Sequence, residues 1–452
     1  MKSKKSRIGT QEELAFPVPM KTIPADESEI PRQSPDQRRV QQLAEELTEK
    51  YSQNLGLSRR EFLSTSSGMA VVFMAMNSVF GRFFAVDPAE AADLAVAQAR
   101  TQALAGQFIF DVQTHCVSPN YTDKWILSLR KRAKKWNPEL KGEKATLDKL
   151  KFDNFYREVY ELSDTKIAML SSAPSDDPNR WFIRNDEIAK IRDILNQKLG
   201  RKALYSHAVI TPGQPGWMEA LDQAISEYKP DAWKGYSVGS PFEISKYPWR
   251  LDDEKLVYPA YEKMLKAGIT KVCIHKGLLP SMYQQKMPTT WEYAKVDDLG
   301  KAAKDWPQLD FIIYHSAIRS GGEPSKGDIK EFEKSGYIPW ITELAGIPEK
   351  NGVSNVYAEL GGVFANSAVS APQYCTGILG TLIKGMGADH VLWGTDSVWH
   401  GSPQWQIEAF RRLEIPEGLR KKFGLAPLGP ADGEVKTLIL GRNAAKLFNA
   451  QS

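Results

Sequence analysis

Several features are scarce in this chain of 452 residues, and each scarcity narrows its possible classes. Cysteine occurs only 3 times, too few for a framework of disulfides, so the fold depends on its apolar core. The formal net charge is only +4, which gives no argument for nucleic-acid binding. The most apolar run, from about residue 68 to residue 80, is shorter than the roughly 20 residues of a membrane-spanning helix. What remains is an ordinary globular composition, 42% hydrophobic and 25% charged.

The front of the chain has a composition different from the rest. Residues 1–57 are rich in Lys, Glu, Gln, Ser and Pro, which predicts a disordered leader. Within it, the amphipathic residues 38–55 are compatible with one short helix. We expect no folded domain in this leader.

Residues 58–92 carry a recognisable pattern. A Ser-Arg-Arg-x-Phe-Leu motif containing Arg59 and Arg60 precedes the apolar run. The pattern resembles a twin-arginine export signal, with Ala89-Glu90-Ala91 as its cleavage site. The alternative is a surface helix with a chance pair of arginines. We therefore expect a protein that meets the twin-arginine export machinery and is periplasmic or extracellular, or membrane-anchored if the segment stays uncleaved.

Eight short apolar segments alternate with helical patterns after residue 107. Such an alternation predicts a parallel sheet covered by helices, and eight units predict a (β/α)₈ TIM barrel over residues 93–452. The alternative is a doubly wound open sheet, but no glycine-rich phosphate loop follows the first strand, where that fold often has one. The predicted strands are 107–115, 165–172, 203–210, 232–238, 271–277, 310–317, 355–362 and 390–397.

Three segments are longer than ordinary loops of a barrel. They are residues 116–150, 239–252 and 278–293, which follow the first, fourth and fifth predicted strands. The second and third are rich in Tyr, Trp and Pro. In a barrel, we expect these loop insertions to cover the active face.

Polar residues mark the ends of four predicted strands. His115, His275 and His315 end the first, fifth and sixth strands, and Asp396 ends the eighth. In a barrel these ends meet on one face, where active sites lie. Three imidazoles and one carboxylate suit Zn²⁺ or another divalent metal. The alternative for each histidine is a hydrogen-bonded core residue.

Taken together, these motifs resemble a known family. The pieces are Asp111-x-x-x-His115, IHKG at His275, YHSA at His315, WGTDS at Asp396, and the closing ILGRNAAKLF. They are similar to the amidohydrolase superfamily, particularly its amidohydrolase-related branch, which contains both hydrolases and decarboxylases.

The resemblance implies a metal site and catalytic roles. It assigns His115, His275 and Asp396 as ligands, with Gln113 as a possible fourth ligand where the family usually has His or Glu. The one expected divalent metal is Zn²⁺. Because an amide oxygen is a poorer ligand that suits a hard ion, Mn²⁺, Mg²⁺ and an empty site are the alternatives. His315 is expected to be catalytic, by polarising a substrate carbonyl or stabilising an oxyanion.

Five further residues are candidates for binding substrate: Arg319, Trp399, His400, Lys234 and Glu359. Arg319 suits an anionic group, with a surface arginine as the alternative. Trp399 belongs to an aromatic roof that favours a ring-bearing or apolar substrate, with ordinary loop packing as the alternative. Lys234 matches the bridging lysine of two-metal relatives. A structural lysine paired with Glu359 is the alternative.

Three functions stay open from the sequence. The first choice is a metal-dependent hydrolase of a small amide, ester or lactone, in which Asp396 is the general base for metal-bound water. The second is a metal-dependent decarboxylase of an aromatic or unsaturated acid. The third is a metal-free exported binding protein. Homo-oligomerisation is left open.

Overall fold

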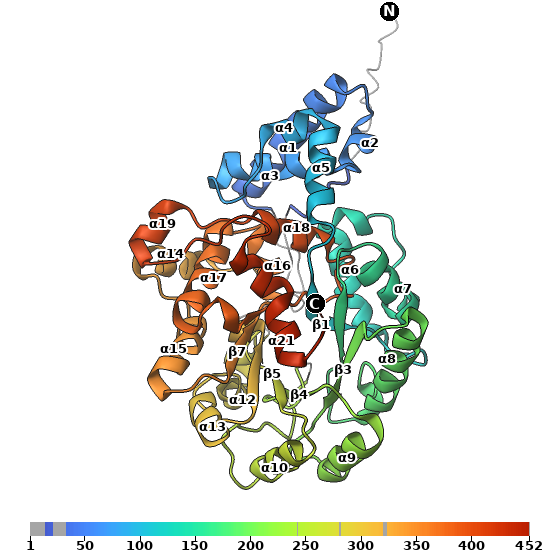
Figure 1. Cartoon of the computed structure of the whole chain (residues 1–452), viewed down its shortest axis with the longest axis vertical. Coiled ribbons are helices and arrows are strands. Elements are labelled where there is room, and N and C mark those ends of the chain that lie inside the picture. The colour runs from blue at the N-terminus through green and yellow to red at the C-terminus, as the bar shows by residue number, and fades with distance from the viewer. Residues whose placement is uncertain (1–13, 21–32, 242, 280–281, 320–322, 452) are drawn as a thin grey trace, which may run out of the picture.

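The computed structural model describes residues 14–20, 33–241, 243–279, 282–319 and 323–451. Figure 1 shows a barrel of strands surrounded by helices, with a group of N-terminal helices stacked on one end of it. We call residues 35–104, which form those N-terminal helices, the N-terminal module.

Eight parallel strands form one sheet in the order β1-β2-β3-β4-β5-β6-β7-β8. Backbone bonds also join the first strand to the last: Val112 N–H donates to Trp393 O at 3.0 Å and Asp396 N–H to Gln113 O at 2.9 Å. The predicted TIM barrel is therefore confirmed. The strands are β1 (Phe110–His115), β2 (Ile167–Ser171), β3 (Leu204–Val209), β4 (Ala232–Tyr236), β5 (Lys271–His275), β6 (Asp310–Tyr314), β7 (Val356–Glu359) and β8 (Val391–Leu392).

Each strand is almost wholly buried, which explains why the segments are apolar on both faces. The helices around them are α8 (Asn185–Leu199), α9 (Trp217–Gln223), α10 (Tyr258–Lys266), α13 (Leu299–Asp305), α14 (Lys326–Ser335), α15 (Ile341–Asn351), α16 (Val363–Ala368), α17 (Pro372–Met386), α18 (Gln404–Arg412), α19 (Glu417–Phe423), α20 (Glu434–Thr437) and α21 (Asn443–Phe448).

The three predicted insertions are present. Between β1 and β2 lie α6 (Leu127–Trp136) and α7 (Phe152–Tyr156), and α11 (Met282–Lys286) and α12 (Pro288–Tyr293) follow β5. After β4, the described residues 237–241 and 243–257 contain no regular strand or helix. These segments follow the carboxyl ends of the strands, where the predicted site residues also lie.

Residues 34–57 were expected to belong to a disordered leader, but they are folded and begin the N-terminal module. Its first helix, α1 (Pro35–Asn54), begins with a capping box of Ser34 and Gln37, which satisfies two backbone N–H groups. Val40 and Ala44 are buried on this helix. The amphipathic residues form a helix as expected, but the helix packs against a partner that composition alone did not reveal. Residues 14–20 of the expected leader are also described, and Leu14, Phe16, Val18 and Met20 are buried in the apolar core. Residues 1–13 and 21–32 lie outside the described residues.

The other helices of the module are α2 (Arg59–Leu63), α3 (Ser66–Phe80), α4 (Pro88–Ala92) and α5 (Leu94–Leu104). The apolar run forms α3, which contacts α1, α4 and α5. Within the described part of the chain, no helix is both long enough and apolar enough to cross a membrane. Twin-arginine export stays a prediction.

Candidate active site

Parallel strands bring the predicted residues to one face of the barrel. His115 and His275 are the last residues of β1 and β5, and His315 directly follows β6. Asp396 lies in the loop after β8. Because side chains alternate along a strand, Gln113 points to the same side as His115.

These five side chains form one chain of contacts. His115 Nε2 lies 3.0 Å from Asp396 Oδ1, and Gln113 Nε2 donates to the same oxygen at 3.2 Å. Gln113 Nε2 also lies 3.3 Å from His315 Nε2, which in turn lies 3.0 Å from His275 Nδ1. The structure thus brings together the imidazoles, the amide and the carboxylate that the sequence placed on separate strands.

Backbone carbonyls fix which ring nitrogens carry hydrogen. His115 Nδ1 lies 3.1 Å from Ser171 O, and His315 Nδ1 lies 2.7 Å from Gly361 O. A carbonyl only accepts, so both Nδ1 atoms are protonated and both Nε2 atoms carry a lone pair when the rings are neutral. A lone pair on His115 Nε2 then faces the Asp396 carboxylate. A proton or a cation between them makes this contact favourable.

Two of the site residues have left-handed backbone conformations. His315 has φ 61° and Asp396 has φ 60°, and Ser316 and Ala317 continue the left-handed turn with φ 44° and 55°. Such conformations cost free energy in residues other than glycine. They persist only where surrounding contacts hold them in place.

Glu359 at the end of β7 supplies those contacts. Its Oε2 accepts the backbone N–H of His315 at 3.0 Å, and its Oε1 accepts that of Gly361 at 2.5 Å. Ser316 Oγ donates to the Glu359 carbonyl at 2.7 Å. Burial raises the pKa of Glu359 to about 8, against the lowering effect of the hydrogen bonds. Glu359 therefore positions the turn that carries His315.

Asp111 holds the loop of Asp396 in a similar way. Its Oδ1 accepts the backbone N–H of Gln113 at 3.1 Å and that of Thr395 at 3.0 Å. The Thr395 hydroxyl donates to Oδ2. Burial raises the pKa of Asp111 to about 7. Strand β1, which carries Gln113, and the loop that carries Asp396 are thereby tied together.

The cluster contains one carboxylate anion and two neutral imidazole rings. Burial alone would raise the pKa of Asp396, but the hydrogen bond and charge of His115 outweigh it and the pKa lies below its ordinary value. Burial lowers the pKa of His315 to about 4 and that of His275 well below its ordinary value. At neutral pH the site therefore holds a carboxylate beside neutral imidazoles.

Aromatic rings enclose the cluster on two sides. Trp399 stacks on the His115 ring with centroids 5.5 Å apart, and Phe182 meets Trp399 edge-on at 5.1 Å. On the other side, Tyr236 stacks on His275 at 4.6 Å. These apolar walls keep the imidazoles away from bulk water.

The remaining predicted substrate residues do not all join the cluster. The Arg319 guanidinium pairs with Asp328 at 2.6 Å, which is the surface alternative. Lys234 is fully buried, with its Nζ 3.3 Å from the Tyr314 ring centroid. Burial lowers the pKa of His400, and the negative charge of Asp396 partly opposes this effect.

Both Glu359 oxygens accept backbone N–H groups, and the negative charge of Glu359 acts on the pKa of Lys234 without a hydrogen bond between the two side chains. Lys234 Nζ has no hydrogen-bond partner. Burial lowers its pKa to about 7. Both side chains are fully buried, as Gln113 and His315 of the cluster are.

The fit to a metal depends on donor chemistry. Across the described ranges, no group of three or more His, Cys, Asp or Glu side chains is already arranged to hold a metal ion, because the donor atoms contact one another. Gln113 Oε1 and His275 Nε2 are nevertheless buried without hydrogen-bond partners, and His115 Nε2 faces a carboxylate. This excess of acceptors suits a divalent cation once the side chains move apart.

Sequence reasoning missed several residues of the site. The positioning role of Glu359 was missed, since its contacts depend on the left-handed turn after β6. Phe182 and Tyr236 carried no motif, although Tyr236 ends β4. Ser171 contributes only its backbone carbonyl, which no side-chain pattern can reveal.

A closed barrel with imidazoles and a carboxylate at the carboxyl ends of its strands defines a barrel enzyme. A profile described as Amidohydrolase matches residues 215–450, and this chain belongs to that family. The matched region contains His275, His315 and Asp396, whereas Gln113 and His115 lie before it. None of the curated proteins matches the sequence significantly.

Solved structures with low sequence identity are similar to this chain. An uncharacterized TIM-barrel protein from Bordetella bronchiseptica has a TM-score of 0.47 and 13% identity, covering 75% of this chain and 99% of its own. The 5-carboxyvanillate decarboxylase from Sphingomonas paucimobilis has a TM-score of 0.44 and 12% identity, covering 76% and 100%. The 2,6-dihydroxybenzoate decarboxylase from Rhizobium has a TM-score of 0.44 and 15% identity, covering 76% and 99%.

Proposed function

We propose that this amidohydrolase-family enzyme is a metal-dependent decarboxylase of a small aromatic acid. The observation that carries the proposal is the aromatic enclosure of a single anionic and imidazole-rich cluster. Trp399 stacks on His115, and Tyr236 stacks on His275. A planar acid would find apolar walls for its ring and a polar floor for its carboxylate.

The chemistry of the enclosure favours loss of CO₂ over attack by water. A carboxylate that enters apolar surroundings gives up its hydration at a free-energy cost. Loss of CO₂ relieves that cost, because the charge leaves the acid group. Hydrolysis instead needs an ordered water as a second reactant.

The metal of this proposal is held by His115, His275 and Asp396, with Gln113 as the fourth ligand. A bound divalent cation would supply positive charge for the substrate's carboxylate. The amide and carboxylate oxygens favour Mn²⁺ or Mg²⁺ over Zn²⁺ in this set. This ordering revises the first choice made from the sequence.

The chain's own residues provide orientation and proton transfer. The neutral His315 presents Nε2 toward the cluster while Gly361 O holds its Nδ1–H. Asp396 keeps 16% of its side chain exposed, against 3% for His115. Asp396 is thus placed to pass a proton between solvent and the ring carbon that loses CO₂.

Hydrolysis of an amide, ester or lactone is the second candidate. The same exposed carboxylate of Asp396 supports it, because a water at this position could be deprotonated by it. Against it, Asp396 Oδ1 is already bound by His115 and Gln113, and the lowered pKa makes the carboxylate a weaker base.

The two reactions are separable by their products. Protein loaded with Mn²⁺ would be incubated with 5-carboxyvanillate, 2,6-dihydroxybenzoate and related aromatic acids, and in parallel with lactones and amides. We expect CO₂ release and incorporation of one solvent deuteron on carbon in D₂O. Asp396→Asn should abolish both. Turnover of only the lactones or amides would contradict the decarboxylase proposal.

A further inference from the structure

We propose that the N-terminal module, residues 35–104, is a permanent part of the mature protein and is not removed as a signal segment. The proposal does not depend on which reaction the barrel performs. It concerns the apolar helix α3, the candidate cleavage site in α4, and their contacts with α18 of the barrel.

The apolar surface of α3 is covered within the protein. Val71, Val72, Phe73, Ala75 and Met76 are fully buried. A helix that is apolar on all sides is stable either in a membrane or inside a core. Here α3 lies inside a core. An export machinery could recognise α3 as a signal segment only after α3 had left that core.

That core is continuous with the core of the barrel. One apolar cluster contains Phe73 and Met76 of α3 together with Trp405 and Phe410 of α18. The Phe73 ring also packs 4.8 Å from Phe84, in the segment that joins α3 to α4. Removal of the module would therefore expose apolar side chains of the barrel to water.

The candidate cleavage site is folded and partly buried. Ala89-Glu90-Ala91 lies within α4, where Glu90 is 5% exposed and Ala91 is fully buried. Proteolysis needs an extended, accessible backbone, which exposed loops provide and a packed helix does not. This position is a poor substrate for a signal peptidase once the chain has folded.

Glu90 has a structural partner in the barrel. Arg412 at the end of α18 donates to Glu90 Oε1 at 3.1 Å and to Oε2 at 2.6 Å, and both residues are buried. A second pair joins Arg100 of α5 to Glu408 of α18 at 2.8 Å. Cleavage after residue 91 would leave Arg412 without its bidentate partner, which is unfavourable for a buried charge.

Backbone pairing reinforces the junction. Ala85 N–H donates to Arg412 O at 2.7 Å, and Glu414 N–H donates to Phe83 O at 2.7 Å. Asn77 of α3 holds the same segment, because its side chain bonds the backbone of Phe83 and Phe84. The module is therefore joined to the helix that follows the Asp396 loop.

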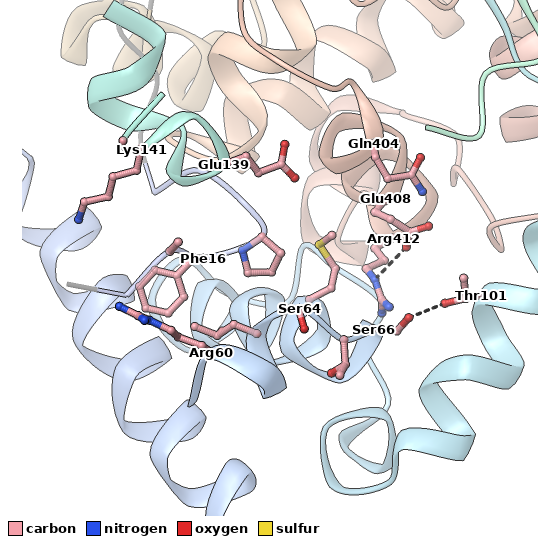
Figure 2. A pocket seen from close by; sticks show the side chains of 16 residues that line it. Phe16, Arg60, Ser64, Ser66, Thr101, Glu139, Lys141, Gln404, Glu408 and Arg412 are labelled. Carbon is pink, nitrogen blue, oxygen red and sulfur yellow. Dashed lines mark hydrogen bonds and ion pairs between the residues drawn. The ribbon is translucent and has the colours of Figure 1, made fainter. Parts of the chain in front are cut away.

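The junction also encloses space beside this helix. A cavity of about 760 Å³ lies between the module and the barrel. Figure 2 shows Phe16 and Arg60 on one side of it, with Glu408 and Arg412 on the other. Arg60, one of the two arginines of the expected export motif, thus lines this junction.

The first test is the amino terminus of the folded protein from the cells that naturally make it. Intact-mass spectrometry with terminal sequencing should find a chain that begins before Pro35 and retains the whole module. A folded protein that begins within a few residues of Ala92 would overturn the proposal.

The second test measures how firmly α3 is held in the full chain. Hydrogen exchange followed by mass spectrometry should show α3 amides protected as strongly as those of α18. Glu90→Gln should make α3 amides exchange at least about tenfold faster, since it weakens the junction. The matched variant Glu46→Gln, on the exposed side of α1, should stay within about twofold of the wild type. Exchange of wild-type α3 at the rate of an unfolded peptide, or equal effects of the two variants, would overturn the proposal.

Discussion

The carboxylate of Glu359 accepts the backbone N–H of His315 at 3.0 Å, and its other oxygen accepts that of Gly361. A side chain at the end of β7 thereby fixes the backbone of the residue that directly follows β6. Because His315 is left-handed, with φ 61°, this contact holds a conformation that the chain would not adopt unaided.

The Glu359→Gln variant tests this positioning role. A glutamine oxygen accepts one of the two N–H groups, and its NH₂ faces the other donor. We expect the free energy of unfolding to fall by about 1–3 kcal/mol, the cost of a buried group left unsatisfied. Chemical denaturation measures it.

The matched control is Glu349→Gln on the exposed surface of α15, which should change the free energy of unfolding by less than about 0.5 kcal/mol. Equal stability of Glu359→Gln and this control would show that the contact does not hold the turn.

Substitution of Gln113 tests its place in the metal site. Gln113→His replaces an amide with a stronger ligand and should tighten Mn²⁺ or Zn²⁺ binding, whereas Gln113→Ala should weaken it. Each change should be at least about tenfold, since even supporting residues of metal sites have effects of this size. Isothermal titration calorimetry with each ion measures the affinities. Unchanged affinity in both variants would place residue 113 outside the ligand set.

The stacking of Trp399 on His115 predicts an effect on substrate binding. Trp399→Leu keeps an apolar side chain but removes the aromatic face, a loss of about 0.5–1.5 kcal/mol for an aromatic pair. We expect KM for the aromatic acid to rise roughly two- to tenfold. Steady-state kinetics would measure it beside Trp217→Leu, on α9 away from the cluster, which should leave KM unchanged. A higher KM in both variants, or in neither, would argue against the aromatic wall.

The junction of module and barrel predicts a dependence of stability on pH. Burial would raise the pKa of Glu408, but the charges of Arg100, Arg411 and Arg412 outweigh it, so the pKa lies below its ordinary value of 4.5. A lowered folded-state pKa stabilises the fold above the unfolded-state value, and the stabilisation is lost as the pH falls through the folded-state pKa.

Denaturation midpoints between pH 7 and pH 3 should therefore decline below about pH 4.5. The decline should be shallower in Glu408→Gln, which is less stable at pH 7 because the arginines lose their partner. The exposed Glu349→Gln variant should follow the wild-type curve. Parallel curves for all three proteins would remove Glu408 from the acid sensitivity.

The barrel could be predicted because its signals are local. The apolar segments ending at His115 and His275 each contain enough β-branched and aromatic residues to indicate a strand. Their alternation with helices fixes the order of the sheet. The convergence of His115, His275 and Asp396 then follows from the topology alone.

The rest of the site depends on contacts that local patterns do not contain. The left-handed turn at His315 is held by Glu359, more than forty residues later in the chain. The apolar residues of α3 have the composition of a signal segment, yet they are covered by α1, α4 and α5. The Arg412 guanidinium, more than three hundred residues away, also lies over the Phe73 ring at 5.6 Å. Neither relationship leaves a periodic trace near the residues it affects.

We propose that one divalent cation binds where His115, His275, Asp396 and Gln113 meet. Crystals grown with Mn²⁺ and measured at the manganese absorption edge test it directly. We expect a single anomalous peak about 2.0–2.3 Å from His115, His275 and Asp396. The absence of a peak at this face under saturating Mn²⁺ and Zn²⁺, in protein that still turns over its substrate, would contradict it.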